Sequence, residues 1–371
     1  MAKERLAYFD NVKGVLIALV VIGHLLEPCA KLGAEALAGF KVLDFIYMFH
    51  MPLFIFVTGL FSKSVFKQGR FRAEVPLFYF AICFLMYTGL MVEKLCLGSE
   101  VSFNYLTLNG RIPWYLMVAG FYVLGVPFFA RLKPSVAMGG GGLVISLLAG
   151  LVDGTNMFSA SRAITFLPIF LAGFYLSPQA IVNQMKNELP GRHRLLMALS
   201  VGIVVIGFLF FQLCGPQKLE FFLTLFYGKG SYDDMLAASG LDLSVGVCML
   251  LRLVSYGAVA AMGVALLALL PTRRVSLLTN AGARSLQVYV LHPFIYYALN
   301  TAKFTDWVFS ALSPVEAVLL LALLGASIAV LLSSSGKPQQ FFDWMKARIA
   351  RWVDRQTPDA RKARNTGGAC S

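Results

Sequence analysis

Long apolar runs dominate this sequence, and they constrain its fold more than any other feature. A helix that crosses the hydrocarbon core of a bilayer needs about 20 mostly apolar residues, and a window of that length predicts ten spans. Hydrophobic residues make up 58% of the chain and charged residues only 14%, which is too apolar a composition for a soluble domain. We therefore predict an all-α, polytopic integral membrane protein with about ten transmembrane helices. The predicted spans are 12–30, 40–62, 74–93, 113–130, 142–153, 162–177, 195–214, 246–270, 284–300 and 314–333.

The distribution of Lys and Arg predicts how these spans are oriented. Ten spans place both termini on one side, and the segments on that side hold 22 of the 32 Lys and Arg residues, against six on the opposite side. Because short basic loops stay in the cytoplasm, we expect both termini to be cytoplasmic and the chain to be a multi-pass protein of the cell (plasma) membrane. The net charge of +13 then reflects topology and predicts no nucleic-acid partner. We expect no cleavable signal peptide before the first span.

The end of the last predicted span divides the chain into a transmembrane domain, 1–335, and a cytoplasmic tail, 336–371. The tail alternates basic and aromatic residues, which is typical of an amphipathic helix on anionic headgroups; a solvated, disordered tail is the alternative. The longest segment predicted outside the cytoplasm, about 215–245, is polar. It is expected to be a loop that lines an entrance for an external ligand.

Three of the four histidines fall inside predicted spans. At a rise of 1.5 Å per residue, His24, His50 and His292 lie about 12 to 18 Å from the cytoplasmic ends of three different spans. A titratable side chain at this depth costs several kcal/mol unless it faces a cavity or a partner. Three histidines at comparable depth therefore predict one shared polar cavity.

A structural role is the alternative for two of these histidines. Pro52 follows His50 by two residues, and Pro293 follows His292 directly. A proline within a span frees a backbone carbonyl that a nearby side chain can satisfy. This explanation is weaker for His24, so the catalytic interpretation is strongest there.

Two arginines and one basic loop are further candidates. Arg162 begins the sixth predicted span and Arg252 lies inside the eighth. Each either snorkels to the outer headgroups or contacts a polar acceptor from that side. The loop after the second span holds four cations that are either ordinary topology determinants or ligands for a phosphorylated cofactor such as coenzyme A. These cations are Lys63, Lys67, Arg70 and Arg72.

Five motifs follow one another over about 290 residues. They are "FDNVKGVLIALVVIGH", "FIYMFHMPLFIFVTGLFSK", "RIPWYLMVAGFYVL", "SRAITFLPIFLAGFY" and "NAGARSLQVYVLHPFI". Together the motifs resemble the membrane-bound acyltransferase family 3, in the branch similar to fucose 4-O-acetylase and related carbohydrate acetyltransferases. Lys13 and His24 fit the family's first motif. Many relatives carry Arg-x-x-Arg before the third span, where this chain has Lys67-x-x-Arg70, so the resemblance assigns no coenzyme A contact to an individual cation.

The resemblance implies an O-acetyltransferase that uses acetyl-CoA as its acyl donor. It implies transfer of the acetyl (acyl) group from the cytoplasm to a hydroxyl of an extracytoplasmic or lipid-linked carbohydrate. The implied partners are the lipid bilayer, acyl-CoA and a glycan acceptor. No metal is expected, because the six cysteines are dispersed without metal-binding spacing.

In this scheme His24 is the general base on the sugar hydroxyl, and an acyl-histidine intermediate is the competing scheme. His50 or His292 orients His24 or donates to the oxyanion. Lys13 holds a coenzyme A phosphate or pairs with Asp10 one turn away. The predicted cofactor-binding residues are Lys13, Lys67, Arg70 and Arg72. The predicted substrate-binding residues are Asp10, Trp114, Arg162 and Arg252.

A transporter or flippase for a glycan or an anionic ligand is the alternative function, since it also needs histidines and arginines within the membrane. No internal repeat is visible, which weakens the case for an inverted-repeat transporter. A structural subunit would leave the three histidines unexplained.

Overall fold

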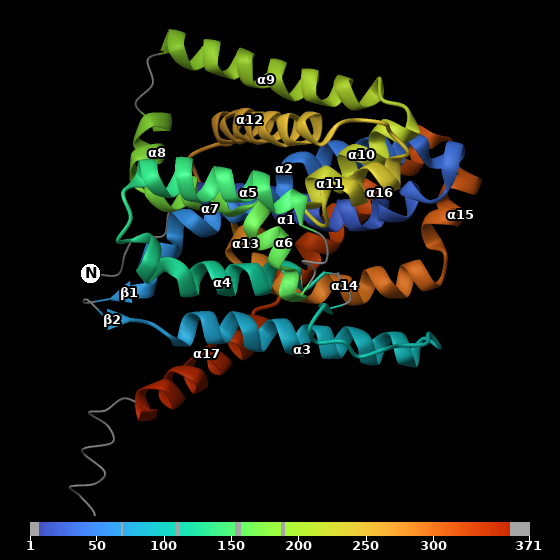
Figure 1. Cartoon of the computed structure of the whole chain (residues 1–371). Coiled ribbons are helices and arrows are strands. Elements are labelled where there is room, and N and C mark those ends of the chain that lie inside the picture. The colour runs from blue at the N-terminus through green and yellow to red at the C-terminus, as the bar shows by residue number, and fades with distance from the viewer. Residues whose placement is uncertain (1–6, 68–69, 109–111, 153–156, 187–189, 357–371) are drawn as a thin grey trace, which may run out of the picture.

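The computed structural model describes residues 7–67, 70–108, 112–152, 157–186 and 190–356. Figure 1 shows the long helices running side by side, with β1, β2 and α8 at one end of the bundle and α10 and α15 at the other. Within the described residues, six helices are long and apolar enough to cross a bilayer. These are α1 (Ala7–Leu26), α2 (Leu37–Ser62), α3 (Glu74–Cys96), α9 (Pro190–Gln212), α12 (Val245–Leu269) and α16 (Pro314–Ser334). The prediction of an all-α, polytopic membrane protein is confirmed.

The other four predicted spans are helical too, but they are shorter or broken. The fourth is α4 (Trp114–Phe129), and the ninth is α14 (Ser285–Thr301). The fifth combines a π-helix (Val136–Leu143), α5 (Val144–Leu148) and a 3-10 turn (Ala149–Leu151). The sixth consists of α6 (Ala160–Thr165) and α7 (Leu167–Tyr175), bent by 60° where Pro168 interrupts the backbone hydrogen bonds. Counted as one span, this pair raises the number of candidates to seven, so the total of ten stays a prediction.

The segment predicted as an outer loop forms two helices instead. α10 (Pro216–Tyr227) begins with a proline at its first turn, and α11 (Tyr232–Ser239) begins with a capping box made by Ser231 and Asp234. Gly228 and Gly230 join them with φ angles of 61° and 81°, which glycine adopts without steric cost. The tight turn directs α10 against α2 at one end of the bundle (Figure 1).

Glycines let the helices that carry the histidines pack at close range. A Cβ atom at Gly14 of α1 would lie 2.2 Å from the carbonyl oxygen of Leu278 in α13 (Ser276–Ala283). A Cβ atom at Gly59 of α2 would lie 2.2 Å from the carbonyl oxygen of Phe170 in α7. Small residues at such contacts are typical of helix packing in membranes. The two contacts hold α1 and α2 in fixed positions.

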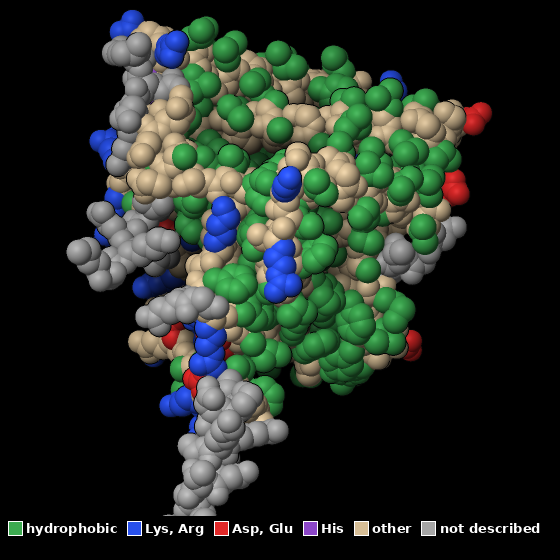
Figure 2. All heavy atoms as spheres, turned by 60° about the vertical axis from the view of Figure 1, so that its left-hand side comes forward, with side chains coloured by type: hydrophobic (Ala, Val, Ile, Leu, Met, Phe, Trp, Pro, Cys, Tyr) green, Lys and Arg blue, Asp and Glu red, His purple; other side chains and the backbone are tan. Residues whose placement is uncertain are grey.

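The surface of the bundle suits a lipid environment. Figure 2 shows hydrophobic side chains spread over the exposed face of the helices, with Lys and Arg gathered toward the side that Figure 1 shows at left. Leucines on α16 illustrate this, because Leu323 and Leu331 are 67% and 68% exposed. Exposure of so much apolar area to water would be unfavourable, whereas contact with the acyl chains of lipids is not.

Short elements cover the end of the bundle where the basic residues gather. The hairpin of β1 (Phe66–Lys67) and β2 (Arg70–Phe71) pairs Lys67 with Arg70. α8 (Pro178–Lys186) lies at this end too, whereas α15 (Phe304–Ala311) lies at the opposite end (Figure 1). α17 (Lys337–Gln356) follows the last predicted span. The tail prediction falls on α17, and residues 357–371 lie outside the described part.

Candidate active site

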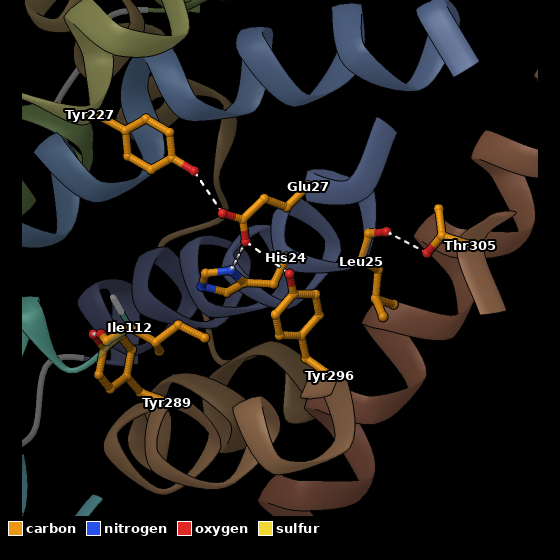
Figure 3. A network of polar contacts seen from close by, with 8 residues as sticks. All are labelled: His24, Leu25, Glu27, Ile112, Tyr227, Tyr289, Tyr296 and Thr305. Carbon is orange, nitrogen blue, oxygen red and sulfur yellow. Dashed lines mark hydrogen bonds and ion pairs between the residues drawn. The ribbon is translucent and has the colours of Figure 1, made fainter. Parts of the chain in front are cut away.

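A carboxylate next to α1 holds the ring of His24. The 3-10 helix η1 (Glu27–Ala30) follows α1 directly and carries Pro28 in its first turn. Nδ1 of His24 lies 3.3 Å from Oε2 of Glu27. Two tyrosine hydroxyls donate to the same carboxylate, Tyr227 of α10 to Oε1 at 2.9 Å and Tyr296 of α14 to Oε2 at 3.2 Å. Figure 3 shows these three side chains converging on Glu27 from separate helices.

Glu27 determines which nitrogen of His24 carries the proton. A carboxylate only accepts hydrogen bonds, so Nδ1 donates to it and Nε2 keeps its lone pair. An imidazole in this tautomer takes up a proton at Nε2, and the carboxylate stabilises the imidazolium that results. His24 and Glu27 together therefore have the parts of a general base.

His50 and His292 each hydrogen-bond to their own helix. Nδ1 of His50 lies 2.8 Å from the carbonyl oxygen of Ile46, and Nδ1 of His292 lies 2.9 Å from that of Val288. A carbonyl only accepts, so both rings carry their proton on Nδ1 and offer Nε2 as an acceptor. Among the described residues, Nε2 of His292 is buried and has no hydrogen-bond partner. The Nδ1 bonds suit a structural role, and the open Nε2 suits a chemical one.

The three histidines converge although they belong to different helices. The ring of His24 stacks on that of His292, with centroids 5.2 Å apart. The ring centroid of His50 lies 4.9 Å from that of Tyr47, and the ring centroid of Tyr47 lies 5.3 Å from that of Tyr227. A cavity of about 40 Å³, the histidine chamber, lies beside these rings; His24 and His50 line it, whereas His292 does not. It is lined by Val20, His24, Tyr47, His50, Met51, Trp114, Phe226, Tyr227 and Tyr289.

A larger cavity of about 310 Å³, the vestibule, lies next to the chamber. Met51 and Tyr289 line both cavities, so these two side chains form a shared wall. The vestibule also carries three cations, Lys13 of α1, Arg72 of the hairpin segment and Lys346 of α17. Because Lys13 and His24 lie eleven residues apart on α1, the cations and the histidines stand at opposite ends of the two cavities.

Comparison with known proteins identifies the family. The model of the family described as acyltransferase domain matches residues 6–334. The chain belongs to this acyltransferase family. The resemblance to acyltransferase family 3 is thereby confirmed.

Two curated relatives resemble a short part of the chain. Nodulation protein NolL of Mesorhizobium japonicum is 43% identical over 67 residues, which is 18% of either protein. Nodulation protein NolL of Sinorhizobium fredii is 38% identical over 74 residues, or 20% of either protein. The alignments thus span about a fifth of these relatives. No solved structure matches the chain significantly.

The structure separates the predicted cofactor-binding residues of this acyltransferase-family chain into two groups. Lys13 and Arg72 line the vestibule, where Lys13 pairs with Asp10 at 2.8 Å and Arg72 with Glu74 at 2.7 Å. Arg70 does not line the vestibule; its Nη2 lies 3.4 Å from Oδ1 of Asp354 in α17, and both side chains are exposed. The side chain of Lys67 lies outside the described part of the chain.

Three predicted substrate-binding residues take different places. Trp114 lines the histidine chamber. Arg162 is buried behind it, with its guanidinium 4.6 Å above the Trp114 ring and its Nε donating to the carbonyl oxygen of Tyr227 at 3.0 Å. Asp10 lines neither the chamber nor the vestibule but a separate basic-side cavity of about 710 Å³. Arg162 is thus a buried cation next to the chamber, and it does not snorkel to the surface.

Arg252 lies apart from the histidine chamber. It is 1% exposed, its guanidinium stands 4.5 Å above the ring of Tyr232, and Nη1 donates to the carbonyl oxygen of Ser146 at 3.4 Å. These contacts tie α12 to α5 and α11. The observed arrangement corresponds neither to a snorkelling arginine nor to a residue of the chamber.

Sequence reasoning missed the carboxylate and its tyrosines. Glu27 follows His24 by three residues in "GHLLEP", and this spacing places the two side chains on one helical face. The local signal was therefore present. Tyr227 and Tyr296 carried no such signal, because only the packing of α10 and α14 brings them to Glu27.

Proposed function

We propose that this chain is a membrane O-acyltransferase that moves an acetyl group from cytoplasmic acetyl-CoA to a hydroxyl of an extracytoplasmic or lipid-linked carbohydrate. One observation carries the proposal. The vestibule with its three cations shares the Met51 and Tyr289 wall with the chamber that exposes His24. Phosphates held by the cations leave the pantetheine arm and its thioester directed toward the base. Membership of the acyltransferase family favours this function over a transporter or flippase.

His24 starts the reaction in this proposal. Its Nε2 removes the proton of the acceptor hydroxyl while the oxygen attacks the thioester carbonyl, and Glu27 stabilises the imidazolium. The tetrahedral intermediate then expels the coenzyme A thiolate, and the imidazolium of His24 donates the proton from Nε2 to the thiolate. Ester and free thiol are the products, and no net proton is gained or lost. The acyl-histidine scheme would instead leave label on the protein before the acceptor binds.

The hydrogen bond at Nδ1 excludes one of the two roles predicted for His50, donation to the oxyanion. A neutral ring that donates to Ile46 cannot also donate to an oxyanion from Nε2. We therefore assign His50 to positioning the sugar through a neighbouring hydroxyl, which donates to its Nε2 while the reacting hydroxyl donates to His24. Trp114 lines the chamber, and its indole N–H is the candidate oxyanion donor.

The size of the chamber supports a short acyl group. A cavity needs about 10 to 15 Å³ to hold one water molecule. The chamber of about 40 Å³ therefore has room for about three heavy atoms, as many as an acetyl group contains. A succinyl group, with its extra carboxylate, exceeds that space. We infer that acetyl-CoA is preferred to succinyl-CoA.

The acceptor enters from the opposite end in this proposal. Phe226 and Tyr227 line the chamber from α10, in the segment predicted to face the outside. Aromatic rings and phenol hydroxyls suit the alternating C–H and O–H groups of a sugar. The same orientation puts the vestibule and both termini in the cytoplasm, as the distribution of Lys and Arg predicts.

Incubation of membranes with radiolabelled acetyl-CoA tests the proposal. We expect label in the glycan fraction of cells that express the chain and none with the His24→Ala variant. Transport of a ligand without transfer of label would support the transporter instead. Replacement by labelled succinyl-CoA should lower incorporation, and equal incorporation would contradict the inference on acyl size.

A further inference from the structure

Helix α17 lies beyond the part of the chain that the family model matches. That match ends at residue 334, and α17 spans Lys337–Gln356. Phe342 anchors the helix with 4% of its side chain exposed. α17 contacts α3, and Figure 1 shows it at the end of the bundle that carries the hairpin. The helix is therefore docked on the basic side of the bundle.

One face of α17 lines two cavities in succession. Gln339 and Asp343 line the basic-side cavity of about 710 Å³, and Lys346 lines the vestibule. These three residues are spaced by four and three positions, so they follow one another along a single helical face. This face of α17 thus forms cavity walls, in addition to the packing contact made by Phe342.

Lys346 differs from the other two cations of the vestibule. Lys13 pairs with Asp10 and Arg72 pairs with Glu74. Among the described residues Lys346 forms no ion pair, and its Nζ lies 5.8 Å from the centre of the Phe78 ring. A half-buried cation beside two others gains most when an anion enters the cavity.

The surroundings of Lys346 support the same reading. Burial lowers the pKa of its ammonium group, and the nearby charge of Arg72 lowers it further, against the opposite effect of Glu74 and Asp343. The charged form of Lys346 is therefore disfavoured. A bound phosphate would remove this penalty.

We propose that Lys346 binds the phosphate groups of the coenzyme A donor and that α17 forms one wall of the donor-binding cavity. The inference rests on the proposed function, since that function supplies the donor. It adds a binding residue from outside the matched domain. The headgroup phosphate of an anionic lipid has the same chemistry and is separated by the experiment below.

Equilibrium binding of radiolabelled acetyl-CoA to the full-length protein in phosphatidylcholine nanodiscs tests this inference. Lys346→Gln should raise the Kd about tenfold, which is about 1.4 kcal/mol. The inhibition constant of S-acetylpantetheine, which lacks the phosphates, should not change. Lys346→Arg should restore most of the affinity for acetyl-CoA.

Arg348→Gln is the matched control. Arg348 is an exposed cation of the same helix, and its guanidinium lies 5.6 Å above the Trp344 ring, outside both cavities. This variant should bind acetyl-CoA as the parent does. An equal loss of affinity in both variants would show a general charge effect and overturn the inference.

Other outcomes separate this inference from the proposed function. An unchanged Kd in Lys346→Gln overturns the role of Lys346 alone, as does a loss of affinity that S-acetylpantetheine shares. If the affinity of the parental protein for acetyl-CoA falls only when phosphatidylglycerol is added, the site belongs to a lipid headgroup. Parental protein that binds acetyl-CoA but transfers no acetyl group overturns the proposed function and leaves the binding role intact. Parental protein that binds no acetyl-CoA overturns both.

Discussion

The histidine chamber and the vestibule share a wall but are built in different ways. The chamber holds His24 between long helices, and its carboxylate partner receives hydrogen bonds from two further elements. The vestibule takes two of its three cations from peripheral segments, Arg72 beside the hairpin and Lys346 on α17. Packing inside a bundle fixes side chains more firmly than attachment at its rim. Under the proposed function, the groups for chemistry are thus preorganised, while the groups proposed for the donor phosphates adjust to their ligand.

The largest effect is expected at the centre of the chamber. His24→Ala removes the general base, which contributes about 10²- to 10⁴-fold to such reactions. We expect acetyl transfer to fall by that range while the amount of protein in the membrane and the Kd for acetyl-CoA stay at parental values. Incorporation of label at the parental rate would exclude His24 as the base.

Glu27→Gln tests whether the chamber is preorganised as described. The amide can offer its N–H₂ in place of a carboxylate oxygen, so the tautomer and charge stabilisation of His24 are lost. We expect a fall of roughly 10²-fold in kcat. The measurement is the rate of label transfer at saturating acetyl-CoA. Glu35→Gln, an exposed acid in the 3-10 helix η2 (Gly33–Ala36), is the control.

Substitutions of the cations at the rim of the vestibule should change the affinity for acetyl-CoA and not the rate of acetyl transfer. Arg72→Ala is expected to raise the KM for acetyl-CoA about tenfold, the value of one charge-assisted hydrogen bond, with kcat little changed. Arg70→Ala should change the KM by less than about twofold, because Arg70 is exposed and outside the cavity. A larger effect of Arg70 than of Arg72 would reverse the assignment of these two cations.

The smallest expected effect is a pH dependence of donor binding. The pKa of Lys346 is lowered by burial and by Arg72, with Glu74 and Asp343 acting in the opposite direction. A lysine is charged below its pKa, so Lys346 loses its charge at a lower pH than an ordinary lysine does. Affinity for acetyl-CoA should thus weaken a few-fold as the pH rises through the alkaline range. Lys346→Arg should bind acetyl-CoA without this loss of affinity at alkaline pH. An identical pH profile in the parent and in Lys346→Arg would argue against the role of Lys346.

Part of the site was predictable from residue positions alone. The helical rise predicts His24, His50 and His292 at comparable depth. In the structure His24 and His50 line one chamber, and His292 stacks on His24 without lining it. Trp114 was predicted from a motif and lines the same chamber. Glu27 could have been added from its three-residue spacing to His24.

Other placements depended on contacts that no local pattern encodes. Arg162 and Arg252 are both buried arginines in apolar helices, yet one lies behind the chamber and the other ties α12 to α5 and α11. Arg70 and Arg72 are two residues apart, and only Arg72 lines the vestibule. The segment 215–245, polar enough to read as a loop, supplies a helix and the hydroxyl of Tyr227.

The sequence by itself determined that the chain is a helical membrane protein. In lipid, the backbone groups of an apolar run of spanning length find hydrogen-bond partners only within a helix. It also predicted how far each histidine lies along its helix, because that distance follows from the residue count along a regular helix. Only the tertiary structure decided which side chains meet. The rotation of each helix, set by close contacts such as Gly14 with Leu278, selects one face for the chamber and turns the others toward lipid or neighbouring helices.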